Sequence, residues 1–245
     1  TKLKFGVKHF IYFGFMGIVG IDVSYVILVY TVEHLSVGYV SVLILFSPLL
    51  TYAIALMFRM EPIVKSRAAG IVIGLAGAAV LVVPDGSLPS SDLLPLALLA
   101  FITPLGYAAA NVFADLARPS NSDNVALAMG TMFAAALGAL IGSLLDDSFY
   151  PIWENIGHTE SLLAFFALST SVAFLIFYAI IKMSGAVYLG QVGYLGTVFG
   201  VCWGILFFAE KPSVWLWLAA ILVAVGVGLV NLGKRSHDEK TSEET

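Results

Sequence analysis

Part of this chain occurs twice. Residues 17–83 and 166–232 align without a gap at an offset of 149 residues, and the hydrophobic blocks and the breaks between them coincide. Identical residues meet at scattered positions, among them Gly77 with Gly226 and Glu61 with Glu210. An internal repeat in a hydrophobic chain is how many membrane transporters are built, with the solute site between the two copies.

The composition is that of a membrane protein. Hydrophobic residues make up 60% of the sequence and charged residues 11%, against roughly a quarter charged in a soluble domain, and the mean hydropathy is +0.96. A helix needs about 20 apolar residues to cross the hydrocarbon layer. We therefore predict an all-α polytopic membrane protein with eight transmembrane helices, at 10–32, 37–58, 67–84, 93–115, 124–145, 161–181, 186–209 and 213–232.

The positive charges favour one orientation. Lys and Arg collect in the cytoplasmic loops of membrane proteins, and the chain has 12 of them. All but Lys211 fall on the same side of the predicted membrane. This pattern predicts an integral protein of the cytoplasmic (inner or plasma) membrane whose C-terminus is cytoplasmic.

The same orientation makes the repeat inverted, because span one runs outward and its counterpart, span six, runs inward. The second copy also includes the spans at 93–115 and 124–145, whose counterparts would precede residue 1. We expect an inverted five-plus-five helix repeat that lacks its first two helices here; a protein with only eight helices is the alternative. The expected parts are 1–84 (three helices of the first copy), 85–92 (an outer linker), 93–232 (the complete second copy) and 233–245 (a disordered cytoplasmic tail).

Each copy closes with a span that ends in a glutamate, a short loop and a Gly-rich span. The sequence reads PLLTYAIALMFRMEPIVKSRAAGIVIGLAGAAVLVV at 48–83 and FFAEKPSVWLWLAAILVAVGVGLVNLG at 207–233. These segments resemble the drug/metabolite transporter (DMT) superfamily, specifically its EamA-type permeases, and the resemblance covers residues 10–233. Pro48 matches a proline common in that family, whereas the second copy has Gly196-Thr197 where a proline is expected.

The resemblance implies a central cavity between two halves that rock about it to give alternating access. It implies a secondary transporter of small organic metabolites, amino-acid-like or drug-like, and most often an exporter. Uptake or gradient-free facilitation is the alternative within this class. A non-transporting membrane protein, such as an integral enzyme or an assembly factor, would need a catalytic constellation or a soluble module, and the sequence shows neither.

Asp22 is the candidate for proton coupling. It lies at the middle of span one, where a carboxylate costs on the order of 3 kcal/mol and is not expected to face lipid. Its counterpart in the second copy is Ser171, so this acid is not symmetric. The alternative is a structural role, in which Asp22 joins two helices through a hydrogen bond, for example to Tyr25.

Polar side chains within the spans are the candidates for lining a solute cavity. Thr103, Tyr107 and Asn111 form a stripe at i+4 steps in span four, and such a stripe faces protein or water rather than lipid. Packing between helices is the alternative role for this stripe. Weaker candidates are Tyr25, Ser171 and Tyr178.

Span seven has two different faces. Polar residues lie within about 60° of one direction and are cavity candidates, while glycines at four-residue spacing lie opposite and predict close helix packing. For the polar face, an interhelical hydrogen bond is the alternative role. The polar residues are Tyr188, Gln191 and Tyr194, and the packing glycines are Gly196, Gly200 and Gly204.

Glu61 and Glu210 repeat at membrane edges, each beside the start of the next helix. A carboxylate is stabilised at a helix N-terminus. We therefore expect each glutamate to cap the helix that follows it.

No motif predicts an enzyme, a metal site or a cofactor. The four His are scattered and Cys202 is the only cysteine, so no cluster has metal-ligand spacing, and the sequence has no phosphate loop and no G-x-S-x-G nucleophile. The expected partners are a small solute, the lipid bilayer and, for coupling through Asp22, protons. The sequence predicts no nucleic-acid partner and leaves the oligomeric state open.

Overall fold

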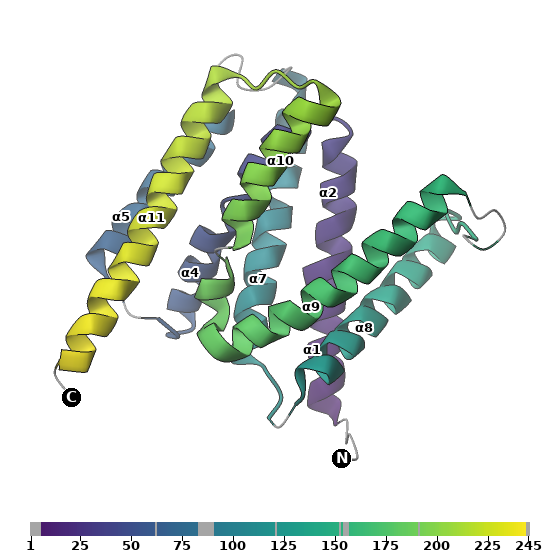
Figure 1. Ribbon diagram of the computed structural model, residues 1–245, viewed down its shortest axis with the longest axis horizontal. Helices are drawn as coiled ribbons and strands as arrows, with labels where there is room; N and C mark the ends of the chain where they lie inside the picture. Colours follow the sequence, from purple (N-terminus) through teal and green to yellow (C-terminus); the bar gives the residue numbers. More distant parts are fainter. Residues whose placement is uncertain are drawn as a thin grey trace.

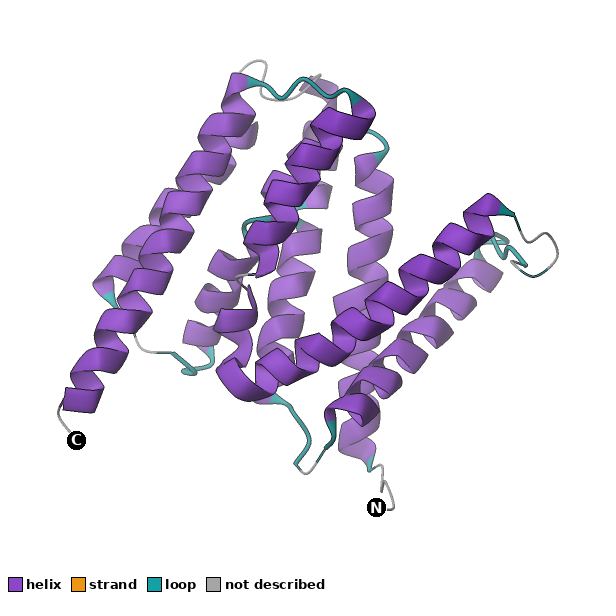
Figure 2. Cartoon of the chain, viewed as in Figure 1, coloured by secondary structure: helices purple, strands orange, loops and turns teal. Residues whose placement is uncertain are grey.

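A computed structural model describes residues 6–61, 63–82, 91–120, 122–151, 153, 157–190 and 192–243, and all regular structure in them is helical (Figure 2). Figure 1 shows the helices as a bundle in which the start of α1 and the end of α11 lie at the same end. The elements are α1 (Val7–Gly17), the π-helix η1 (Ile18–Val23), α2 (Ser24–Val32), α3 (Val37–Ile44), α4 (Ser47–Met57), α5 (Lys65–Val82), the 3₁₀ helix η2 (Ser91–Leu93), α6 (Leu94–Ala100), α7 (Ile102–Leu116), α8 (Asn124–Leu145), α9 (His158–Gly190), α10 (Val192–Phe208) and α11 (Val214–Glu243).

The prediction of an all-α polytopic membrane protein is confirmed. Five helical segments are long and apolar enough to cross a membrane, namely 7–32, 37–57, 94–116, 124–145 and 158–190. Shorter apolar stretches lie in α5, α10 and α11. Apart from the end of α11, the helices coincide with the predicted spans to within a few residues, because long apolar runs and their polar breaks determine where membrane helices begin and end.

α9 contains a break between predicted spans six and seven. Gly185 has a φ of 78°, a left-handed conformation that glycine adopts without strain. Helical geometry resumes at Ala186, whose backbone N–H donates to Asp115 Oδ2 at 3.2 Å. Asp115, at the end of α7, therefore caps the helical segment that starts at Ala186, where predicted span seven begins.

Counterpart helices of the two copies pack on each other. α5 contacts α11, and α3 of the 37–58 span contacts α10 of the 186–209 span. Figure 1 shows α5 and α11 side by side along one flank of the bundle. Glycines make this contact: a Cβ on Gly226 would lie 2.5 Å from the Gly70 carbonyl oxygen and 2.8 Å from the Gly74 nitrogen. Without side chains at these positions, the two backbones approach closely enough for strong van der Waals packing.

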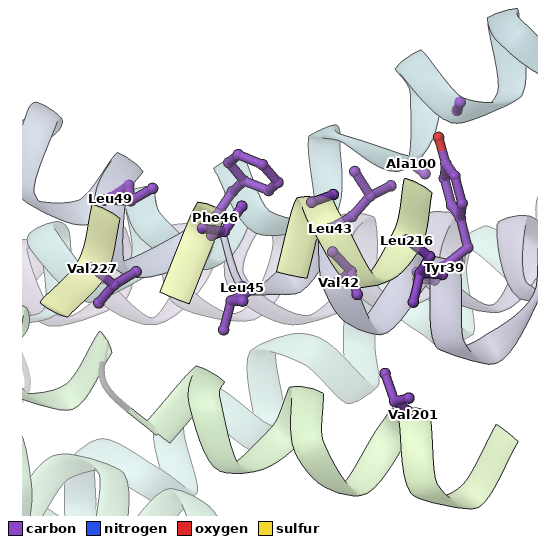
Figure 3. Close-up of a cluster of buried hydrophobic side chains, with 14 of the residues drawn as sticks. Tyr39, Val42, Leu43, Leu45, Phe46, Leu49, Ala100, Val201, Leu216 and Val227 are labelled. Carbon is purple, nitrogen blue, oxygen red and sulfur yellow. The ribbon is translucent and has the colours of Figure 1, made fainter. Parts of the chain in front are cut away.

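The largest buried cluster surrounds α3 (Figure 3). Leu43 and Phe46 are almost fully buried there, and α11 and α10 supply Leu216 and Val201. This cluster joins helices from both copies, so the halves share one packed interior on this side of the bundle.

α8 and α9 form a hairpin that leans away from the α5–α11 flank (Figure 1). α8 packs on α1, where a Cβ on Gly17 would lie 2.6 Å from the Ala135 nitrogen. A second buried cluster, which includes Tyr12, Leu127 and Tyr178, fills the space between α1, α7, α8 and α9.

The expected disordered tail is wrong for residues 233–243, because α11 continues through Glu243. Residues 234–243 contain neither proline nor glycine, so nothing in that sequence interrupts the helix that begins at Val214. Residues 244–245 and most of the expected linker, 85–90, lie outside the described residues.

Candidate functional site

A cavity of about 430 Å³ lies in the middle of the bundle. Span one, the α3–α4 break, α7, α9 and α10 all contribute to its wall. The described lining residues are Met16, Gly20, Tyr25, Ile44, Ser47, Tyr107, Ala110, Asn111, Phe174, Phe177, Leu189, Gly190, Val192, Gly193 and Gly196.

Three pairs of wall residues are repeat counterparts. At the offset of 149 residues, Tyr25 corresponds to Phe174, and the other two pairs are Ile44 with Gly193 and Ser47 with Gly196. Both repeat segments therefore contribute equivalent positions to the wall of one cavity. Its two sides differ, because the first copy supplies hydroxyl groups where the second supplies a phenyl ring and a glycine.

Irregular backbone surrounds the cavity. The π-helix η1 includes the wall residue Gly20, and π-helical turns within α-helices occur frequently at functional sites. The helix also breaks between α3 and α4, just before Pro48. Proline has no N–H, so the carbonyl of Ile44, four residues earlier, lacks its usual α-helical donor. Within a membrane, such backbone is tolerated where it is buried in protein or lines a cavity.

Asn111 belongs to a directed hydrogen-bond chain at the cavity wall. Its Nδ2 donates to Thr51 Oγ1 at 3.3 Å, and Thr51 Oγ1 donates to the Ser47 carbonyl oxygen at 2.7 Å. Asn111 is 7% exposed. Because Thr51 has a single hydroxyl proton, and the Ser47 carbonyl receives it, Thr51 acts as the acceptor toward Asn111.

The wall carries no formal charge among the described residues: it contains no Asp, Glu, Lys, Arg or His. Aromatic rings dominate instead. Tyr25 meets Tyr107 edge-on with ring centroids 6.4 Å apart, and Phe174 stacks on Phe177 at 5.4 Å. In the described part of the chain, no group of three or more His, Cys, Asp or Glu side chains is placed to hold a metal ion.

The cavity brings together Tyr25, Tyr107 and Asn111 of the predicted lining residues. It does not include Thr103 or Ser171, and their hydroxyl groups show why. Thr103 is fully buried and donates to the Ser24 carbonyl oxygen at 3.3 Å, whereas Ser171 lies on the exposed side of α9 and donates to the Ala167 carbonyl oxygen at 2.8 Å. Backbone carbonyls thus satisfy both hydroxyls away from the cavity.

Tyr178 and Tyr188 are also placed elsewhere, contrary to the sequence prediction. Tyr178 is fully buried in the cluster between α1 and α9, and its hydroxyl bonds Thr131 Oγ1 at 2.5 Å. Tyr188 is 52% exposed and is not among the described wall residues. Gln191 lies outside the described residues, and the structure describes only the backbone of Tyr194.

The three predicted packing glycines separate into two groups. Gly200 lies against Ser41 and Gly204 against Gly38 and Glu210, so both face α3 as expected for packing. Gly196 instead lines the cavity, and a Cβ there would have no neighbour within 4 Å. Its position on α10 therefore provides open space rather than a helix contact.

Asp22 lies in η1 and points toward α8, not toward the described cavity wall. Its Oδ2 contacts the position that a side chain on Gly138 would occupy, and this buried oxygen has no hydrogen-bond partner. The alternative hydrogen bond from Tyr25 to this oxygen is therefore absent. Gly138 leaves the room in which the carboxylate sits.

Sequence reasoning missed the phenyl rings of Phe174 and Phe177 and the backbone wall at Gly190 and Gly193. These residues carry no polar signal that separates them from ordinary membrane core. The repeat itself could have found Phe174, because it is the counterpart of the predicted wall residue Tyr25.

Glu210 caps a helix of the other copy rather than the helix that follows it. Its two carboxylate oxygens accept the N–H groups of Val37 and Gly38, the first two residues of α3, at 2.6 and 2.9 Å. α11 is capped by Ser213, whose Oγ accepts from Leu216 N at 3.2 Å. The expectation that Glu210 caps α11 is therefore wrong, and the carboxylate joins the two copies at one end of the bundle.

The sequence of the chain matches one known protein family. The EamA-like transporter family matches residues 1–83 and 94–232. The chain belongs to this family. Membership of the EamA-like transporter family makes the chain an integral membrane transporter of the DMT superfamily, and it confirms the resemblance seen in the closing spans of the two copies.

Structural comparison agrees with this membership at the level of the fold. One crystal structure of a protein resembles the chain with a TM-score of 0.60 and 22% sequence identity, over 90% of this chain and 76% of that one. No curated protein matches the chain. Within the EamA-like transporter family, the central cavity is thus the natural place to seek a solute site.

Proposed function

We propose that the chain is a secondary transporter that exports small organic solutes by alternating access through the central cavity. The supporting observation is that equivalent positions of the two copies line one cavity. In transporters built from inverted repeats, the solute site lies at the interface of the copies, and the copies expose it to one side of the membrane and then to the other.

The direction of transport follows the family resemblance, in which export is commonest; uptake or gradient-free facilitation is the alternative. The division into copies at 1–84 and 93–232, and the cytoplasmic position of the C-terminus, belong to the same proposal. The placement of the positive charges supports this orientation.

We expect Gly196→Leu to lower solute flux at least tenfold without unfolding the protein. The Cβ position of Gly196 has no neighbour within 4 Å and opens on the cavity, so a leucine side chain would extend into solute space. Flux would be measured as entry of labelled phenylalanine and labelled phenyl glucoside into proteoliposomes. Gly228→Leu, at an equally open position on α11, is the matched control and should leave flux unchanged. Wild-type flux in the Gly196 variant, or no flux of either solute through the wild type, would contradict the proposal.

We also propose that Asp22 carries a coupling proton. A buried carboxylate oxygen without a partner, in a π-helical turn next to the cavity wall, supports this role. Asp22→Asn keeps the size of the side chain but cannot release a proton, so flux driven by a pH gradient should stop while gradient-free exchange continues.

The measurement is solute flux in proteoliposomes with and without an imposed pH gradient. Asp123→Asn is the matched control, because Asp123 is exposed and its side chain caps no helix. If the Asp22 variant responds to the gradient as the wild type does, Asp22 has no coupling role.

A further inference from the structure

We propose that the cavity selects uncharged aromatic solutes that carry a hydrogen-bond donor. The inference rests on the proposed function, since it takes the central cavity as the solute site. It narrows the solute class from organic metabolites in general to molecules with one aromatic ring, no net or separated charges, and a carboxamide, hydroxyl or similar N–H or O–H group.

The described cavity wall offers no countercharge to an ion. The described wall contains no ionised side chain. Moving an ion from water into such a site costs several kcal/mol unless an opposite charge or several hydrogen bonds replace its hydration. A carboxylate, an ammonium group or an amino-acid zwitterion would bear this cost, whereas an uncharged solute would not.

Aromatic rings form much of the described cavity surface. The rings of Tyr25, Tyr107, Phe174 and Phe177 come from three different spans and line one space. They already pair with one another, edge-on in the tyrosine pair and stacked in the phenylalanine pair. They form walls against which a ring can pack rather than a cage that surrounds a cation.

The hydrogen bonds at the cavity wall have a defined direction. Thr51 gives its only proton to the Ser47 carbonyl, so Asn111 presents its nitrogen to Thr51. The amide oxygen, which accepts hydrogen bonds, is therefore the other polar atom of Asn111. The Ile44 carbonyl, which lacks a helical donor because of Pro48, is a second acceptor; its oxygen would lie 3.8 Å from a Cβ on the wall residue Gly193. Because these wall atoms accept hydrogen bonds, a solute that binds them needs a hydrogen-bond donor.

Binding of four phenyl compounds of nearly equal size tests the charge selectivity. The compounds are 3-phenylpropanamide (uncharged), 3-phenylpropionate (anion), 3-phenylpropylamine (cation) and phenylalanine (zwitterion), measured by isothermal titration calorimetry on the detergent-purified chain at pH 7. We expect the amide to bind at least tenfold more tightly than each of the others. Equal or tighter binding of any charged compound would overturn the proposal, and so would no binding by any of the four.

A fifth compound tests the donor. N,N-dimethyl-3-phenylpropanamide keeps the ring and the carbonyl but has no N–H, so it should bind at least threefold more weakly than the parent amide. Equal affinity of the two amides would overturn the requirement for a donor.

Asn111→Asp tests the wall directly, because it replaces the amide with a carboxylate of the same shape. This change should raise the affinity for 3-phenylpropylamine at least tenfold relative to wild type. Thr103→Val is the matched control: Thr103 is on the same helix and buried, but it bonds the Ser24 carbonyl outside the cavity, so the wild-type ranking should persist. An unchanged ranking in a folded Asn111 variant would overturn the proposal, and if that variant does not fold, the wild-type ranking decides.

These results separate the inference from the proposed function. Tight binding of the amide with no flux of phenylalanine or phenyl glucoside would support the selectivity and contradict transport. Clear flux together with equal affinity for charged and uncharged compounds would support transport and overturn the selectivity.

Discussion

Gly226→Ala is expected to lower the free energy of unfolding by about 2 kcal/mol, the middle of the range for overpacked positions. The methyl group would lie 2.5 Å from the Gly70 carbonyl oxygen and 2.8 Å from the Gly74 nitrogen. Both are backbone atoms and cannot rotate away, so α5 and α11 would have to separate along their contact. The measurement is denaturant titration of the purified protein in mixed micelles.

Gly228→Ala is the matched control, two residues along the same helix. A methyl group there has no neighbour within 4 Å, and alanine favours a helix over glycine by roughly 0.5–1 kcal/mol. The two substitutions should therefore change stability in opposite directions. A neutral or stabilising effect of Gly226→Ala would show that the α5–α11 contact is looser than described.

Glu210→Gln is expected to lower the free energy of unfolding by about 2 kcal/mol, because hydrogen bonds to a charged group contribute more to stability than hydrogen bonds between neutral groups. The carboxylate accepts two backbone N–H groups at the start of α3. A glutamine has one acceptor oxygen, and its NH₂ group would face the second donor. The folded fraction would be followed against temperature and denaturant in detergent.

Glu33→Gln provides the control for charge removal at the same end of the bundle. Glu33 is exposed at the end of α2, and surface substitutions of this kind usually change stability by less than about 0.5 kcal/mol. If Glu210→Gln were no more destabilising than Glu33→Gln, the bond between the two copies would contribute nothing measurable to stability.

The spans were predictable because they depend on local sequence. An apolar run such as 124–145 must be helical in a bilayer, and polar residues end it on either side. The break at Gly185 divides α9 into two helical segments. The predicted boundary between spans six and seven, at 181–186, falls near this break.

Which side chains line the cavity and which pack between helices was only partly predictable from the sequence. Tyr107 and Tyr178 look alike in sequence, yet one lines the cavity and the other is buried against Thr131. Which neighbour a helix face meets depends on the packing of several helices and not on the helix itself. A hydroxyl group is also a weak indicator of a cavity, because a serine such as Ser171 can donate its hydrogen bond to a backbone carbonyl of its own helix.

The partner of Glu210 was beyond sequence reasoning because it lies far away along the chain. The nearest helix start in sequence is Val214, and the one that the carboxylate reaches is Val37. Room for the carboxylate comes from Gly38 and Gly204, whose Cβ atoms would lie 3.0 and 2.5 Å from Oε2. At the other end, the counterparts of these two glycines are Val187 and Ala55, and there Asp115 accepts the backbone N–H of Ala186.

The π-helix η1 places residues of span one that are five positions apart on the same face of the helix. Met16, Gly20 and Tyr25 all line the cavity, although Gly20 and Tyr25 are five residues apart. In an unbroken α-helix, five residues would rotate Tyr25 by about 140° from Gly20, onto a different face. The extra residue in the π-turn changes the rotation by about 100°, so that one residue each from α1, η1 and α2 forms a single stripe. An insertion or deletion of one residue here would leave the span's length almost unchanged and yet replace the side chain that lines the cavity.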